Sequence, residues 1–113
     1  MDAELGFPQR ASSASPAQIV KLIVSGEAAA DIERLRAFLI DKNPAAASRA
    51  VATLVNAIES LEILPERGRP SGIANMRELI VPFGQSAYVI RYIHRARTGE
   101  IVILRIWHGR ESR

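Results

Sequence analysis

The 113-residue sequence contains no cysteine, and it contains only two histidines. Without cysteine the chain can form neither a disulfide nor a thiolate metal site. No carboxylate stands at ligand spacing beside either histidine, so a zinc site is not expected either. We therefore expect no metal and no cofactor.

Long apolar runs are also missing from the sequence. No apolar stretch approaches the roughly 18 residues that a membrane-spanning helix needs. The first residues, MDAELGFPQR, lack the basic start and the apolar centre of a secretion signal. These absences predict a cytoplasmic protein with no membrane partner.

Lysine is scarce, whereas arginine is concentrated in the second half of the chain. The net charge is +3 at pH 7, and no lysine occurs after Lys42. Residues 65–113 carry nine arginines against four acidic side chains. Arginine binds phosphate or carboxylate in a bidentate manner and is less costly than lysine to desolvate. This distribution is typical of a surface that faces nucleic acid or acidic protein, although a solvated basic face would have the same composition.

The length is that of one domain with a modest core. Residues 1–16 are rich in serine, alanine and proline and show no sustained periodicity, which predicts a flexible N-terminal extension. We assign residues 17–113 to a single domain without internal repeats.

The first half of this domain predicts a short strand followed by a helical hairpin. Residues 19–24 form a β-branched run, and residues 26–64 carry apolar side chains at helical spacing. Ser25 and Asn43 are placed to cap the two helices, and Pro44 suits the first position of the second helix. The expected apolar stripes are Ala28, Ile32, Leu35 and Leu39 in the first helix and Ala47, Val51, Leu54, Ile58 and Leu61 in the second.

The second half changes to a period of two, after the turn-rich segment 65–72. Residues 77–81, 86–95 and 101–108 predict three antiparallel strands. Because burying unpaired arginines is costly, we expect them on the face that the helices leave open. The faces expected to meet the helices carry Tyr88, Ile90, Val102, Leu104 and Ile106, and the open face carries Arg91, Arg105 and Trp107. The order β-α-α-β-β-β predicts an α+β fold with the helical hairpin packed on one face of a small, mainly antiparallel sheet.

Four segments occur in a characteristic order along this domain. They read LEILPERGRP, MRELIV, YVIRYI and ILRIWHGRE. Together with the alanine-rich hairpin they resemble the ParE/RelE superfamily of toxins from type II toxin–antitoxin systems, and most closely its ParE branch. The resemblance covers residues 20–111, and each segment alone is a weak signal.

The resemblance implies a bacterial toxin that a small antitoxin neutralises by direct binding in a hetero-oligomeric complex. For the ParE branch it implies a ParD-like antitoxin, a role in plasmid stabilisation and inhibition of DNA gyrase without a catalysed reaction. For the RelE branch it implies cleavage of mRNA on the ribosome. A member that binds its antitoxin but has lost toxicity is a third alternative.

The residues themselves favour the ParE branch. Cleavage of RNA needs a base, an acid and cations around one phosphate. His108 could transfer protons there, and Arg77 and Arg105 could bind the phosphate. Ribosome-dependent relatives usually place an arginine or lysine early in the penultimate strand, where this sequence reads SAYVIRY, and no well-placed carboxylate accompanies His108. We therefore favour a toxin with no catalytic residues and keep the endonuclease as the alternative.

Two interaction surfaces follow as expectations. Aromatic and arginine side chains are enriched among residues that dominate binding energy. The residues expected to bind the target are Arg77, Arg91, Arg105, Trp107, His108 and Arg110. An amphipathic partner helix can lie in an apolar groove. The residues expected to bind the antitoxin are Ile32, Leu35, Phe38, Leu39, Val51 and Val55.

Overall fold

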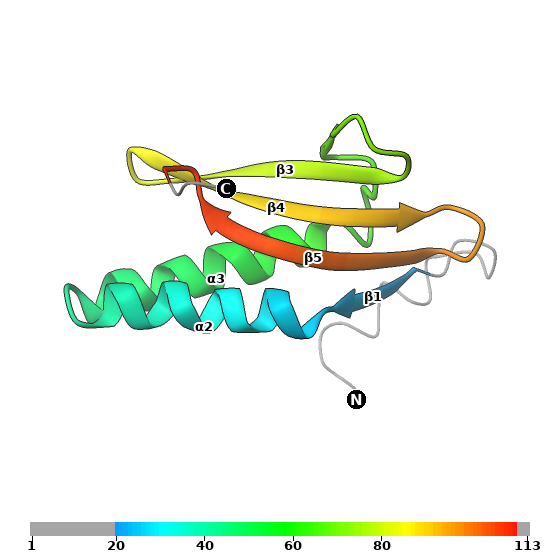
Figure 1. Ribbon diagram of the computed structural model, residues 1–113. Coiled ribbons are helices and arrows are strands. Elements are labelled where there is room, and N and C mark those ends of the chain that lie inside the picture. The colour runs from blue at the N-terminus through cyan, green and yellow to red at the C-terminus, as the bar shows by residue number, and fades with distance from the viewer. Residues whose placement is uncertain (1–19, 111–113) are drawn as a thin grey trace.

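The computed structural model describes residues 20–110, so the expected extension 1–16 lies outside the described residues. The helical hairpin follows the first strand and precedes all the others (Figure 1). The elements are β1 (Lys21–Val24), α2 (Gly26–Ile40), α3 (Pro44–Ser60), β2 (Arg69–Pro70), β3 (Met76–Phe83), β4 (Ser86–Arg95) and β5 (Glu100–His108). Within residues 20–110, neither helix combines the length and apolar character needed to cross a membrane.

Side-chain caps fix where the two helices begin. The Ser25 hydroxyl accepts a hydrogen bond from the backbone N–H of Ala28 at 3.0 Å. The Asn43 amide oxygen accepts one from the N–H of Ala46 at 3.1 Å, and Pro44 occupies the first turn of α3. Both caps satisfy N–H groups that have no partner inside a helix. The predicted starts of both helices are confirmed.

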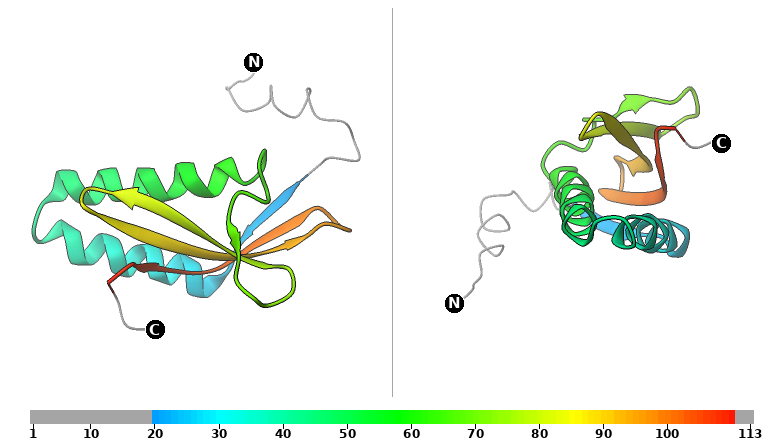
Figure 2. Two further views of the ribbon diagram at one scale, coloured as in Figure 1. Left: turned by 90° about the horizontal axis from the view of Figure 1, so that it is seen from above. Right: turned by 90° about the vertical axis from the view of Figure 1, so that its left-hand side faces the viewer.

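The strands form one five-stranded sheet in the order β1-β5-β4-β3-β2. The outer strand β1 runs parallel to β5, and all other neighbours are antiparallel. Both helices cover the same face of the sheet and leave the other face open (Figure 2). The predicted α+β fold is confirmed. The two-residue strand β2 was not expected, because its segment reads as a turn-rich linker.

A single hydrophobic core lies between the hairpin and the covered face of the sheet. The largest fully buried side chains come from the end of the hairpin and from the two central strands. They are Leu54, Leu61, Ile90, Tyr92, Ile101, Ile103 and Ile106. Because these side chains fix the inner faces of β4 and β5, the alternate residues of both strands are held on the open face.

A β-bulge in β5 corrects the expected faces of that strand. Arg91 pairs with Arg105, whereas the next residue, Tyr92, pairs with Ile103, so Leu104 has no partner of its own. The extra residue reverses the alternation at this point. The residues of β5 that enter the core are therefore Ile101, Ile103 and Ile106, and the expectation was wrong for Val102 and Leu104.

Candidate interaction site on the C-terminal strand

The open face of the sheet brings together three of the expected target-binding residues. Arg105 pairs with Arg91, and Trp107 pairs with Val89 across the β4–β5 ladder. The Arg91 guanidinium lies over the Trp107 ring, 4.9 Å from its centroid. A guanidinium in this position is attracted by the negative face of the ring. Arg91 and Trp107 therefore form a stacked pair, with Arg105 opposite Arg91 in the ladder, and Trp107 is only 7% exposed.

Arg91 is oriented by a carboxylate from the neighbouring strand. Its Nε and Nη2 atoms both donate to Oε2 of Glu78, at 3.1 and 2.8 Å. Arg69 approaches the other carboxylate oxygen of Glu78 at 3.8 Å. These contacts leave Arg91 half-buried and hold its side chain in one conformation. A partner that binds the guanidinium therefore causes little further loss of side-chain entropy.

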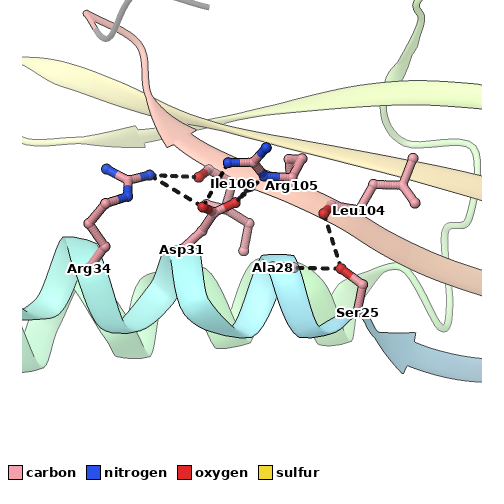
Figure 3. A network of polar contacts seen from close by, with 7 residues as sticks. All are labelled: Ser25, Ala28, Asp31, Arg34, Leu104, Arg105 and Ile106. Carbon is pink, nitrogen blue, oxygen red and sulfur yellow. Dashed lines mark hydrogen bonds and ion pairs between the residues drawn. The ribbon is translucent and has the colours of Figure 1, made fainter.

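Arg105 is held from the helical layer by Asp31 of α2 (Figure 3). Its Nε and Nη2 atoms donate to the two carboxylate oxygens of Asp31, at 2.8 and 3.1 Å. The backbone N–H of Ile106 donates to the same carboxylate at 2.8 Å. Asp31 is 4% exposed, so this pair joins α2 to β5 from within the protein.

The same helix satisfies the edge of β5 beyond the point where β1 ends. The Ser25 hydroxyl donates to the carbonyl oxygen of Leu104 at 3.1 Å, and Arg34 lies 3.4 Å from both the carbonyl oxygen of Ile106 and the Asp31 carboxylate. Ser25, the N-cap of α2, and Arg34 within α2 thus replace the missing strand partner of β5 (Figure 3). This arrangement covers backbone groups that would otherwise form an unpaired edge.

The carboxylate of Asp31 is stabilised in its ionised form. Burial by itself raises the pKa of Asp31, but the hydrogen bonds from Arg105 and Ile106 and the charge of Arg105 together lower it below 3.8. Asp31 is therefore ionised at neutral pH, when it can pair with Arg105. From the sequence alone, an acid near the start of a helix is expected only to suit the helix dipole. The sequence does carry one indication of a buried role for Asp31, because this acid lies next to the apolar stripe between Ala28 and Leu35.

His108 lies on the opposite face from Arg105 and Trp107. It pairs with Tyr88 across the ladder, and the two rings meet edge to face with centroids 5.5 Å apart. Its Nδ1 atom accepts a hydrogen bond from the backbone N–H of Arg110 at 3.1 Å. His108 therefore belongs to the covered side, where it closes the end of the sheet.

Arg77 lies far from His108 although both point to the covered face. Arg77 pairs with Tyr92, four residues along β4 from Tyr88, and β3 is two strands away from β5. Strand geometry separates the two positions by roughly 16 Å. The structure thus does not bring His108, Arg77 and Arg105 around one point. Arg110 is exposed in the turn after β5.

The residues expected to bind the antitoxin divide into two groups. Leu35 is buried, and Ile32 and Leu39 pack against the core, so these three face the sheet. Phe38 is 63% exposed on the outer side of the hairpin, where Lys42 Nζ lies 4.9 Å from its ring centroid. The last two, Val51 and Val55, line a groove between α2 and α3 together with Ile40 and Ala52. The groove faces away from the sheet and is open to a partner.

Comparisons with known proteins all match toxins or a toxin–antitoxin system. The family model described as the ParE toxin of the type II toxin–antitoxin system parDE matches residues 22–113. Toxin RelE1 of Caulobacter vibrioides is 45% identical over 92 residues, which cover 81% of this chain and 96% of that toxin. Toxin RelE3 of the same organism is 39% identical over 83 residues, covering 74% of this chain and 87% of that toxin. A solved chain of the chromosomal ParDE toxin–antitoxin system of P. aeruginosa has the same fold, with a TM-score of 0.67, 24% identity and coverage of 80% of this chain and 97% of that chain.

Proposed function

The chain belongs to the ParE/RelE superfamily of type II toxin–antitoxin toxins, and from that membership we propose that it inhibits DNA gyrase by binding and is neutralised by a ParD-like antitoxin. The observation that supports binding over catalysis is the placement of the three candidate nuclease residues. A catalysed cleavage needs its acid, its base and its cation around one phosphate. Here the Arg105 guanidinium is bound to Asp31 of α2, His108 packs against Tyr88 at one end of the sheet, and Arg77 is bound to the carbonyl oxygen of Gly68 at the other end.

The proposed contact with gyrase is the open face of β4 and β5 together with the turn that follows. Arg91, Arg105 and Trp107 form its centre, and Arg110 extends it beyond the end of β5. Aromatic and arginine side chains that become buried on binding are the usual anchors of protein interfaces. Trp107 is already only 7% exposed, so it supports the Arg91 guanidinium that is stacked on it. Glu78 and Asp31 hold the two strand arginines in place, so the surface needs little rearrangement before it binds.

The proposed contact with the antitoxin is the outer groove of the hairpin. Ile40, Val51 and Val55 supply its apolar lining, and Arg36 stands at its wall. A groove between two helices accepts the apolar face of a third amphipathic helix. Phe38 does not line this groove, because it lies two residues from both Arg36 and Ile40 and so points to another side of α2.

A second candidate function is a ribosome-dependent mRNA endonuclease. The observation that favours it is that the relatives from Caulobacter vibrioides are named Toxin RelE1 and Toxin RelE3. Within the described residues, His108 would remain the proton-transferring side chain of such an enzyme, and Arg110 would be the arginine nearest to it in sequence.

A supercoiling assay separates the two candidates in vitro. We expect the purified chain to inhibit ATP-dependent supercoiling by gyrase in proportion to the amount added. We expect the small antitoxin encoded beside it to restore supercoiling when mixed in equal amount. Programmed ribosomes given the same toxin should keep their mRNA intact. Undisturbed supercoiling together with cleaved ribosome-bound mRNA would overturn the proposal and establish the endonuclease.

A further inference from the structure

The segment between α3 and β2 is bound to the far end of the sheet, away from His108. The Tyr92 hydroxyl accepts a hydrogen bond from the N–H of Gly68 and donates one to the carbonyl oxygen of Pro65, both at 2.8 Å. Burial raises the pKa of Tyr92 above 10.0, so the hydroxyl keeps the proton that it donates. A Cβ atom on Gly68 would lie 2.8 Å from the Tyr92 ring, so only glycine allows this close approach. The segment 65–68 is therefore held in a fixed position against the sheet, and it forms one wall of the pocket described below.

Arg77 is anchored to this wall through one end of its guanidinium. Its Nη1 atom donates to the carbonyl oxygen of Gly68 at 2.6 Å and to that of Glu66 at 3.3 Å. Among the described residues, nothing accepts from its Nε or Nη2 atoms. The guanidinium is thus fixed in position while a pair of donors is left for another group.

His94 stands beside Arg77 on the same face of the sheet. The backbone N–H of His94 donates to the carbonyl oxygen of Asn75 at 2.9 Å, and Arg77 pairs with Tyr92. The two side chains are therefore diagonal neighbours on adjacent strands, with Cα atoms roughly 7–8 Å apart. In the part of the chain that the structure describes, the His94 ring makes no hydrogen bond and no ion pair.

These two side chains line a pocket of about 360 Å³ between the wall and the β2–β3 loop. Ile73, Met76 and Pro70 supply apolar surface to it, and Glu66 is the acidic side chain in its lining. The size lies at the lower end of the range of small-molecule sites, which combine apolar walls with a few polar groups that converge. The pocket therefore has the composition of a ligand site.

We propose that this pocket binds the phosphate group of a small organic phosphate. Nε and Nη2 of Arg77 would hold two phosphate oxygens in a bidentate manner, and a ring N–H of His94 would donate to the third. A carboxylate has only two oxygens and would leave the histidine unused. The organic part of the ligand lies against Ile73 and Met76, as a nucleoside would.

Two charged side chains beside the pocket act on a bound anion in opposite directions. Arg97 lies in the neighbouring β4–β5 turn and has no ion pair within residues 20–110, so its charge adds to the attraction of an anion. Glu66 lines the same pocket but is exposed, so solvent screens its repulsion of the anion. The proposal does not rest on gyrase inhibition, because the pocket lies neither on the open face nor in the hairpin groove.

Nuclear magnetic resonance of the full-length chain tests the pocket directly. The ¹⁵N-labelled protein would be titrated separately with adenosine 5′-monophosphate, inorganic phosphate and adenosine. We expect the monophosphate to bind more tightly than inorganic phosphate and adenosine not to bind, with the largest shifts at Gly68 and His94. Equal affinity for the monophosphate and adenosine, or shifts spread over the other surfaces, would overturn the proposal. Equal affinity for the monophosphate and inorganic phosphate would overturn the proposed contact of the organic part with Ile73 and Met76.

Three variants make the test specific. His94→Ala should weaken the binding of the monophosphate about tenfold, because it removes one hydrogen bond to a charged group. Glu66→Gln should strengthen it about threefold, because it removes an exposed negative charge beside the phosphate. Arg97→Ala is the control for long-range attraction of the anion by positive charge, and it should weaken the binding of the monophosphate less than His94→Ala does. Thermal unfolding establishes that each variant is folded, and an Arg97 variant that weakens binding as much as the His94 variant would contradict a built site.

Discussion

Replacing Asp31 by alanine should lower the free energy of unfolding by about 3 kcal/mol. The substitution leaves Arg105 without its carboxylate and the N–H of Ile106 without an acceptor. Removal of one partner from a buried pair typically costs about 3–5 kcal/mol. We expect the lower end because the Arg105 side chain is 39% exposed and remains in contact with water. Denaturant unfolding at pH 7 measures the loss.

Glu33→Ala is the matched control for this variant. Glu33 lies on the same helix, is exposed and pairs with Arg36 at 3.2 Å. An exposed pair of this kind contributes little, so the free energy of unfolding should change by less than about 1 kcal/mol. If Asp31→Ala and Glu33→Ala had equal effects, the network between α2 and β5 would not stabilise the fold as we describe.

The pH dependence of the free energy of unfolding, measured for the wild type and for Asp31→Ala, provides a second test. The pKa of Asp31 is lower in the folded than in the unfolded state, so its contribution is present above the unfolded pKa of about 3.9. That contribution is lost as the pH falls through the folded pKa, because the carboxylate is then protonated. The difference in stability between the wild type and Asp31→Ala should stay constant from about pH 7 to 5 and shrink below about pH 4.

His108→Gln should retain most of the toxicity, whereas Arg110→Ala should lose much of it. Glutamine keeps a hydrogen-bonding group near the N–H of Arg110 but cannot transfer protons near neutral pH. Truncating an interface arginine costs about 2 kcal/mol, or about thirtyfold in affinity. Arg110 is a cleaner probe than Trp107, because Trp107 is 7% exposed and its truncation would also weaken the core. The measurement is the inducer concentration that halves the number of surviving colonies.

The endonuclease alternative predicts the reverse order. Loss of an acid–base group typically lowers the rate about a hundredfold or more. A folded His108→Gln protein without toxicity, beside an Arg110→Ala protein with full toxicity, would therefore contradict the binding surface. Circular dichroism and equal expression levels must accompany both variants, so that a loss of protein is not read as a loss of function.

The fold could be predicted from the sequence because its signals are local. The caps Ser25 and Asn43, the helical stripes and the period of two in residues 77–108 each depend on neighbours in the chain. The bulge at Leu104 could not be predicted, because a single extra residue leaves no mark in the alternation of an apolar strand. Arg105 and Trp107 nevertheless alternate with Ile106 as expected, because all three follow the bulge, but Arg105 is bound to the buried Asp31 and Trp107 is only 7% exposed.

The sites were harder to predict because they join distant segments. Asp31 meets Arg105 across 74 positions of the sequence, and an acid on an apolar stripe does not reveal its partner. The pocket at the far end of the sheet combines Glu66, Arg77 and His94 from three segments. The composition of PERGRP indicates a turn-rich linker, whereas in the structure Tyr92 and Arg77 bind its backbone. Such contacts become visible only once the strands are in register.

The most direct test of binding rather than catalysis is what fails first when the chain is induced in bacterial cells without its antitoxin. Cell shape, the DNA-damage response and the integrity of ribosome-bound mRNA would be followed over the first minutes after induction. Inhibition of gyrase predicts filamentous cells and a DNA-damage response while the mRNA stays intact. An immediate stop in translation with codon-biased cuts in ribosome-bound mRNA, and no DNA damage, would contradict the account.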